Sequence, residues 1–107
     1  GPVSISKRGQ IALKKGHILS NEPGYYEEGQ FGIRHETLVH VTAAHEGYLK
    51  FETLTCFPFD RQLIDKAYLS SKHISWLNAY HHSVYERLAP HLETDVRHWL
   101  ADRCAPL

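Results

Sequence analysis

Several common signals are missing from these 107 residues. The chain has no excess of charge, because twelve lysines and arginines balance twelve aspartates and glutamates. We therefore expect no broad positive surface that would attract nucleic acid or an anionic membrane. No apolar run approaches the roughly 20 residues that a membrane-spanning helix needs, so we expect no membrane insertion.

Cysteine is also scarce. Cys56 and Cys104 are the only two, and they lie far apart without a Cys-x-x-Cys spacing. This excludes a zinc ribbon and a disulfide-dense secreted scaffold, and it makes a reducing cytoplasm the expected compartment. What the chain does contain is 42% hydrophobic and 11% aromatic residues, enough to bury a core.

The first half of the chain predicts antiparallel strands, because its apolar stretches are rich in β-branched and aromatic residues. The predicted strands are a weak one at 11–13 and stronger ones at 17–22, 31–41 and 48–59. Pro23-Gly24 has the chemistry of a turn, with glycine accepting a positive φ, and residues 28–30 form the expected bend before the next strand.

Beyond residue 59 the apolar residues recur every three or four positions, which predicts helices. The first helix is expected to be capped by Ser70 or Ser71 and to end at Pro90. A shorter helix is expected from Thr94 as its cap, with one apolar stripe made of Val96, Trp99, Leu100 and Cys104. The predicted class is α+β, with strands over 1–59 and a helical tail over 60–107 in one domain.

Two carboxylates, Glu22 and Glu36, fall opposite each other if the strands form a hairpin centred on Gly29. Like charges placed opposite each other destabilise a sheet, so the pair favours a compensating cation. Arg34 could supply it, because Arg34 and Glu36 point to the same side of a strand. A hard divalent metal ion could supply it too. Solvated surface charges are the simpler interpretation of this spacing.

The surrounding residues resemble a known family. Glu22-Pro23-Gly24-Tyr25-Tyr26, followed by Phe31-Gly32-Ile33-Arg34-x-Glu36, closely resembles the C-terminal part of aminopeptidase P, the Xaa-Pro aminopeptidases among the pita-bread metallopeptidases. The resemblance continues through Trp76-Leu77-Asn78-x-Tyr80-His81 and the closing Ala105-Pro106-Leu107, which are similar to the larger, three-domain subtype. His35 departs from the family, where an apolar residue is usual, and we expect it to pack behind the sheet.

The resemblance implies a hydrolase with two divalent metal ions, usually manganese, that removes an N-terminal residue preceding proline. It also implies a cytoplasmic homodimer as the parent protein. By position, Glu22 resembles a metal ligand that also carries a proton, and Glu36 resembles the carboxylate that bridges both metals. Arg34 and Tyr26 resemble an arginine and a tyrosine beside those ligands. The expected catalytic residues are therefore Glu22, Arg34 and Tyr26, and the expected metal ligands are Glu22 and Glu36.

The family uses five protein ligands, and the other two aspartates and one histidine are expected upstream of Gly1. Gly1-Pro2 resembles the family segment that directly follows a His-Glu pair. We therefore expect this chain to be a fragment of the metallopeptidase and to be inactive alone. The alternative hypothesis is a non-catalytic dimerisation or interaction module derived from the same fold.

Overall fold

The computed structural model describes residues 3–107, so the expectation for Gly1-Pro2 lies outside the described residues. The chain divides into two compact units, a first unit up to Thr55 and a second unit Cys56–Leu107. This division lies close to the predicted change from strands to helices after residue 59. That both units belong to one catalytic domain stays a prediction.

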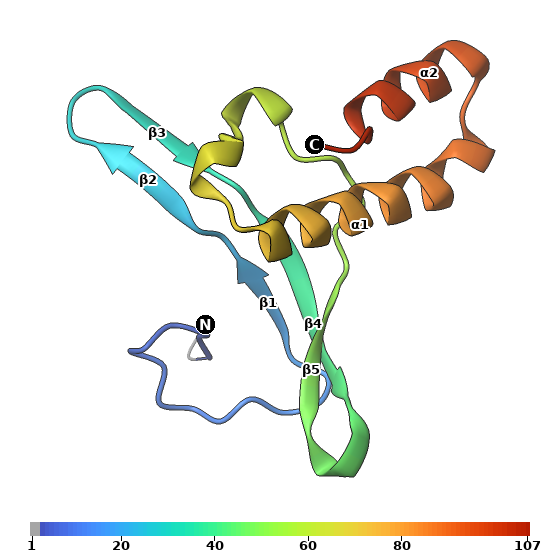
Figure 1. The fold of residues 1–107 in the computed structure, drawn as a ribbon. Coiled ribbons are helices and arrows are strands. Elements are labelled where there is room, and N and C mark those ends of the chain that lie inside the picture. The colour runs from blue at the N-terminus through green and yellow to red at the C-terminus, as the bar shows by residue number, and fades with distance from the viewer. Residues whose placement is uncertain (1–2) are drawn as a thin grey trace. The chain divides into compact units, whose positions relative to one another are not determined.

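The first unit is built from antiparallel strands (Figure 1). They are β1 (Ile18–Asn21), β2 (Gly24–Glu27), β3 (Phe31–Arg34), β4 (Thr37–Ala43) and β5 (Leu49–Thr53), with a 3₁₀ turn at His45–Gly47 before β5. One sheet has the order β1-β4-β5, and β2 and β3 form a second, two-stranded sheet. Because β1 leads directly into β2 and β3 into β4, the two sheets continue one long hairpin (Figure 1).

The predicted strand 31–41 is wrong in one respect, since it is broken between Arg34 and Thr37. Pro23 lies on the facing strand, and proline has no N–H to add to a ladder, which explains the break. The predicted turn at Pro23-Gly24 is also wrong, because Gly24 begins β2. The chain reverses where the bend was predicted, at Gly29, whose φ is +69°.

Two further strand predictions need correction. No strand forms at 11–13 or elsewhere in the described part of the chain before Ile18, although Leu13 still packs against the core of the first unit. β5 ends at Thr53 rather than at residue 59. The Leu38 N–H donates a 2.7 Å hydrogen bond to the side-chain hydroxyl of Thr55 instead of to a backbone carbonyl, so the regular pairing stops here. Because β4 begins at Thr37, it has no residue left to pair with the chain beyond Thr55.

The core of the first unit lies on one face of β4. Thr37, Val39 and Val41 are buried, whereas Leu38 between them is exposed, as the alternation of side chains along a strand requires. Leu19 pairs with Val39 from the neighbouring β1 and completes this buried cluster.

The second unit contains the predicted helices. α1 (Ser71–Leu88) begins after Ser70, whose hydroxyl accepts a hydrogen bond from the His73 N–H, and it ends just before Pro90, as expected. The short 3₁₀ helices are η2 (Arg61–Leu63), η3 (Lys66–Tyr68) and η4 (Ala89–His91). None of the described helices is both long and apolar enough to cross a membrane.

α2 (Thr94–Arg103) differs from its prediction by one residue at its start, because Glu93 and not Thr94 occupies the cap position. The predicted stripe is half buried. Leu100 and Cys104 join the core, while Val96 and Trp99 remain 44% and 45% exposed. This small unit covers only the inner side of the stripe. The remaining core residues come from α1 and are Tyr80 and Val84.

Residues of the helical tail that carry the family resemblance make hydrogen bonds within this unit. The Tyr80 hydroxyl donates to the Phe57 carbonyl at 2.7 Å, and His81 Nε2 accepts from the Phe59 N–H at 3.1 Å. The Asn78 side chain accepts a 2.8 Å hydrogen bond from the Leu107 N–H. These contacts hold the segments before and after the helices against α1.

Candidate metal centre

The hairpin register places the two predicted carboxylates in the break between the sheets. The β1–β4 ladder ends at the pair Asn21 and Thr37, and the β2–β3 ladder begins at Gly24 and Arg34. Both ladders are centred on Gly29, so the predicted register is confirmed.

Within the break, the His35 N–H donates a 3.2 Å hydrogen bond to the Pro23 carbonyl and keeps the two strands in step. Glu22 and Glu36 take the remaining pair of opposing positions. Since no ladder bond pairs them, these two residues lie where the backbone leaves the regular sheet.

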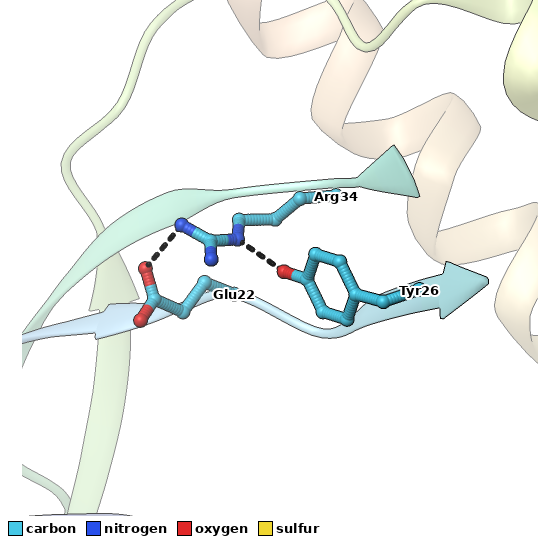
Figure 2. Close-up of polar contacts among 3 residues, drawn as sticks. All are labelled: Glu22, Tyr26 and Arg34. Atoms are coloured by element: carbon cyan, nitrogen blue, oxygen red, sulfur yellow. Dashed lines mark hydrogen bonds and ion pairs between the residues drawn. The ribbon is translucent and has the colours of Figure 1, made fainter. Parts of the chain in front are cut away.

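Arg34 connects two of the predicted site residues (Figure 2). Its Nε–H donates a 2.8 Å hydrogen bond to the Tyr26 hydroxyl, and its Nη1 lies 3.6 Å from Oε2 of Glu22. The guanidinium carbon also lies 5.8 Å from the centre of the Tyr26 ring. Arg34 is thus a cation beside Glu22, as the charge argument predicted, and it is held from the other side by Tyr26.

The pKa of Arg34 is raised above its ordinary value. The hydrogen bond to Tyr26 is the largest cause, Glu22 adds to it, and Glu36 makes the smallest contribution. The guanidinium therefore stays charged at any physiological pH. Two carboxylates face this single cation, so one negative charge of the cluster remains for another positive group.

The cluster is open to solvent. The side chains of Arg34 and Glu22 are 48% and 44% exposed, and Tyr26 is exposed as well. Exposed ion pairs contribute little to folding stability, because water and salt screen them. Stability thus gives no strong reason for gathering these groups, and the carboxylate oxygens are accessible to a ligand.

The donor chemistry of Glu22 and Glu36 suits a hard divalent ion, which prefers carboxylate oxygens. Two ligands are fewer than such an ion needs. Across residues 3–107, no three His, Cys, Asp or Glu side chains gather closely enough to hold a metal ion. The described residues thus fit part of a metal site, and the roles of Glu22, Glu36, Arg34 and Tyr26 stay predictions.

Three residues gain importance only from the structure. Gly24 and Gly32 lie against the ring of Tyr26. His81 is completely buried, and its Nδ1 makes no hydrogen bond within the described structure. Its neighbour Tyr80 on α1 is buried as well. For Gly24 and Gly32, the only signal in the sequence was that each lies an even number of positions from Tyr26, which places both on the same face of the hairpin as Tyr26.

Family models match both units. Residues 1–43 match metallopeptidase family M24, and residues 47–107 match the C-terminal region of peptidase M24. The chain belongs to the M24 metallopeptidases. Over its whole length this M24 chain is 44% identical to aminopeptidase P2 from Arabidopsis thaliana and 40% identical to a probable Xaa-Pro aminopeptidase P from Coprinopsis cinerea. It spans only 16% and 19% of those two relatives.

A solved M24 structure has the same fold. X-prolyl aminopeptidase from Caenorhabditis elegans, described as a cytosolic enzyme with a di-nuclear active site, is 33% identical and matches with a TM-score of 0.85. The match covers all of this chain and 19% of that one. It confirms the α+β class, the resemblance to the C-terminal part of aminopeptidase P, and the corresponding portion of the pita-bread fold.

Proposed function

We propose that the natural polypeptide carrying this chain is a metal-dependent aminopeptidase that hydrolyses the bond between an N-terminal residue and a following proline. The observation that carries the proposal is the opposition of Glu22 and Glu36 in the hairpin break, with Arg34 bound beside Glu22. The names of the M24 relatives support the substrate class, which is a peptide with proline in second position.

In this proposal Glu22 and Glu36 hold two divalent ions, taken to be manganese, together with ligands from beyond these 107 residues. Bound ions of this kind lower the pKa of a water molecule towards neutrality and polarise a carbonyl. Glu22 takes the proton of the attacking water and returns it to the leaving proline nitrogen. Arg34 and Tyr26 keep the Glu22 carboxylate in place. We further propose that the enzyme is a cytoplasmic homodimer.

The isolated 107-residue chain should be inactive, because two carboxylates cannot hold a catalytic pair of ions. Incubation of the purified chain with Mn²⁺ and an Xaa-Pro peptide should release no N-terminal residue. Release at a rate above that of the peptide in buffer would contradict the expected inactivity of the isolated chain and the need for further metal ligands.

The decisive experiment uses the natural polypeptide and its Glu36→Gln variant. We expect Mn²⁺-dependent release of the N-terminal residue from an Xaa-Pro peptide, and a loss of about 1000-fold or more in kcat/KM for the variant, since the ions supply several kcal/mol. The amount of metal bound per polypeptide, measured by elemental mass spectrometry, should fall as well.

Glu27→Gln is the matched control, because Glu27 is an exposed glutamate in β2 of the same hairpin and lies outside the break. It should keep its bound metal and its activity. If the wild-type polypeptide cleaves no Xaa-Pro peptide, the proposal is wrong, and the alternative of a dimerisation or interaction module is favoured.

A further inference from the structure

Gly24 and Gly32 share one face of the hairpin with Tyr26 and Arg34. Tyr26 pairs with Gly32, and Gly24 pairs with Arg34. Cross-strand partners point to the same side, and so do residues two apart on one strand. Two of the four positions on this face are therefore glycines, and a tyrosine and an arginine occupy the others.

The ring of Tyr26 lies directly over both glycines. A Cβ added at Gly32 would be 2.7 Å from Cδ1 of Tyr26 and 3.1 Å from its Cε1. A Cβ added at Gly24 would be 2.6 Å from the Tyr26 hydroxyl oxygen and 2.9 Å from Cζ. Ordinary contacts between carbon atoms are about 3.5–4.0 Å. The Tyr26 ring thus packs directly on the backbone of the two glycines, with its Cδ1 edge over Gly32 and its hydroxyl over Gly24.

Backbone conformation does not require glycine at either position. Gly29 at the turn has a positive φ, whereas Gly24 and Gly32 lie in β2 and β3 outside the left-handed region. Glycine inside a strand weakens it, because it has no side chain to pack and loses more entropy on folding. Close approach of the Tyr26 ring accounts for Gly32, and at Gly24 the ring acts together with the Ile33 carbonyl oxygen, which would lie 3.0 Å from an added Cβ.

This ring position has a consequence for the candidate metal centre. Lying across the two glycines, Tyr26 reaches diagonally to Arg34 and accepts its 2.8 Å hydrogen bond (Figure 2). Arg34 then reaches Glu22 with its outer nitrogen at 3.6 Å. A tyrosine lifted off the hairpin by a methyl group could not hold the guanidinium in this direction.

We propose that Gly24 and Gly32 are positioning residues, which form a track free of side chains that seats Tyr26 and thereby orients Arg34 and Glu22. The inference rests on the proposed function, in which Glu22 is a metal ligand. Substitutions behind metal ligands typically reduce metal affinity or activity about 10–100-fold.

Gly32→Ala is the first test, because the nearest atoms to the added methyl group all belong to Tyr26. In the natural polypeptide we expect a crystal structure of this variant to show the Tyr26 hydroxyl no longer within 3.5 Å of Arg34 Nε. We also expect kcat/KM and Mn²⁺ affinity to fall about 10–100-fold. If Gly32→Ala fails to fold, Gly24→Ala replaces it. Its methyl group would meet the hydroxyl end of the same ring and would also lie 3.0 Å from the Ile33 carbonyl oxygen.

A double-mutant cycle separates positioning from general damage. Tyr26→Phe removes the hydrogen bond and keeps the ring, so its effect on kcat/KM should resemble that of Gly32→Ala. If both act through the contact between Tyr26 and Arg34, the double variant should lose little more than either single variant. Multiplied losses in the double variant would overturn the proposal.

Two controls belong to this hairpin. Gly29→Asn changes the turn in open space, and asparagine tolerates a positive φ, so activity should be retained. Tyr25→Phe removes a hydroxyl from the opposite face and should also leave kcat/KM unchanged. A Gly32→Ala variant with an intact contact between Tyr26 and Arg34 and wild-type metal affinity would refute the track. Wild-type protein without peptidase activity would refute the proposed function instead, and the crystal structure would still test the track.

Discussion

Two groups of polar side chains in this molecule look alike in composition and differ in setting. In the hairpin, Tyr26 bonds to Arg34, and both are exposed. In the helical unit, Tyr80 and His81 are buried and bond to the backbone of residues 57–59. A buried polar group without a partner costs about 1–3 kcal/mol, so the bonds of the Tyr80 hydroxyl and of His81 Nε2 have a structural reason, while Nδ1 of His81 makes none within the described residues. Exposed groups have no such need, so stability does not explain the hairpin cluster, and the chemical role proposed for it is what remains to be tested.

The strongest test of this difference between the two groups is to remove the charge of Glu22. Glu22→Gln in the natural polypeptide should lower kcat/KM by about 1000-fold or more, because the proposed metal ligand and proton carrier would be lost. The free energy of unfolding of the metal-free polypeptide should change by less than about 0.5 kcal/mol, as is usual for exposed positions. Peptide hydrolysis and thermal unfolding measure the two effects. A large loss of stability would show that the hairpin cluster is structural.

The opposite result is expected in the core of the helical unit. Leu100 is 2% exposed, and Leu100→Ala should destabilise this unit by about 2–5 kcal/mol through lost burial and a residual cavity. Hydrogen exchange of the α1 amides should accelerate accordingly, while the amides of β4 serve as an internal reference. Protection of α1 equal to wild type would contradict the assigned core.

A tyrosine comparison is finer, because Tyr80→Phe removes only a hydroxyl. The Phe57 carbonyl would lose its 2.7 Å hydrogen bond, and the α1 amides should lose about 1 kcal/mol of protection. Tyr26→Phe, at an exposed position, should leave the protection of β2 and β3 unchanged within about 0.5 kcal/mol. Equal losses of protection at both sites would show that the exposed and the buried tyrosine hydroxyl contribute equally to stability.

Much of this arrangement could be predicted from the sequence. The turn at Gly29 and the alternation along strands fixed the opposition of Glu22 and Glu36, because a hairpin register follows from its turn. Ser70 and Pro90 bounded α1 through local chemistry. The flat seating of Tyr26 could not be predicted, since it depends on a side-chain rotamer and on the space left by two glycines. The exposure of Trp99 could not either, because periodicity orients a stripe without showing how much of it a neighbour covers.

The smallest expected effect depends on pH and comes from His81. Burial lowers the pKa of this histidine, and the charge of Arg61 lowers it further. The folded state keeps the imidazole neutral, with Nε2 as an acceptor, while the unfolded chain binds a proton near pH 6.5. The contribution of His81 to stability is therefore complete above about pH 6.5 and declines as the pH falls towards the lowered pKa.

The slope of this decline cannot exceed about 1.4 kcal/mol per pH unit for one group. Hydrogen exchange of the α1 amides between pH 7 and pH 5, corrected for intrinsic rates, should show it. His81→Gln keeps an acceptor for the Phe59 N–H without titrating, so its protection should vary less with pH. His82→Gln, one residue further along α1 and exposed, should keep the wild-type slope. His81 bonds to Phe59 within the second unit, so a loss of α1 protection at pH 5 should leave the hairpin amides unaffected. A parallel loss in the hairpin would mean that the two units unfold together.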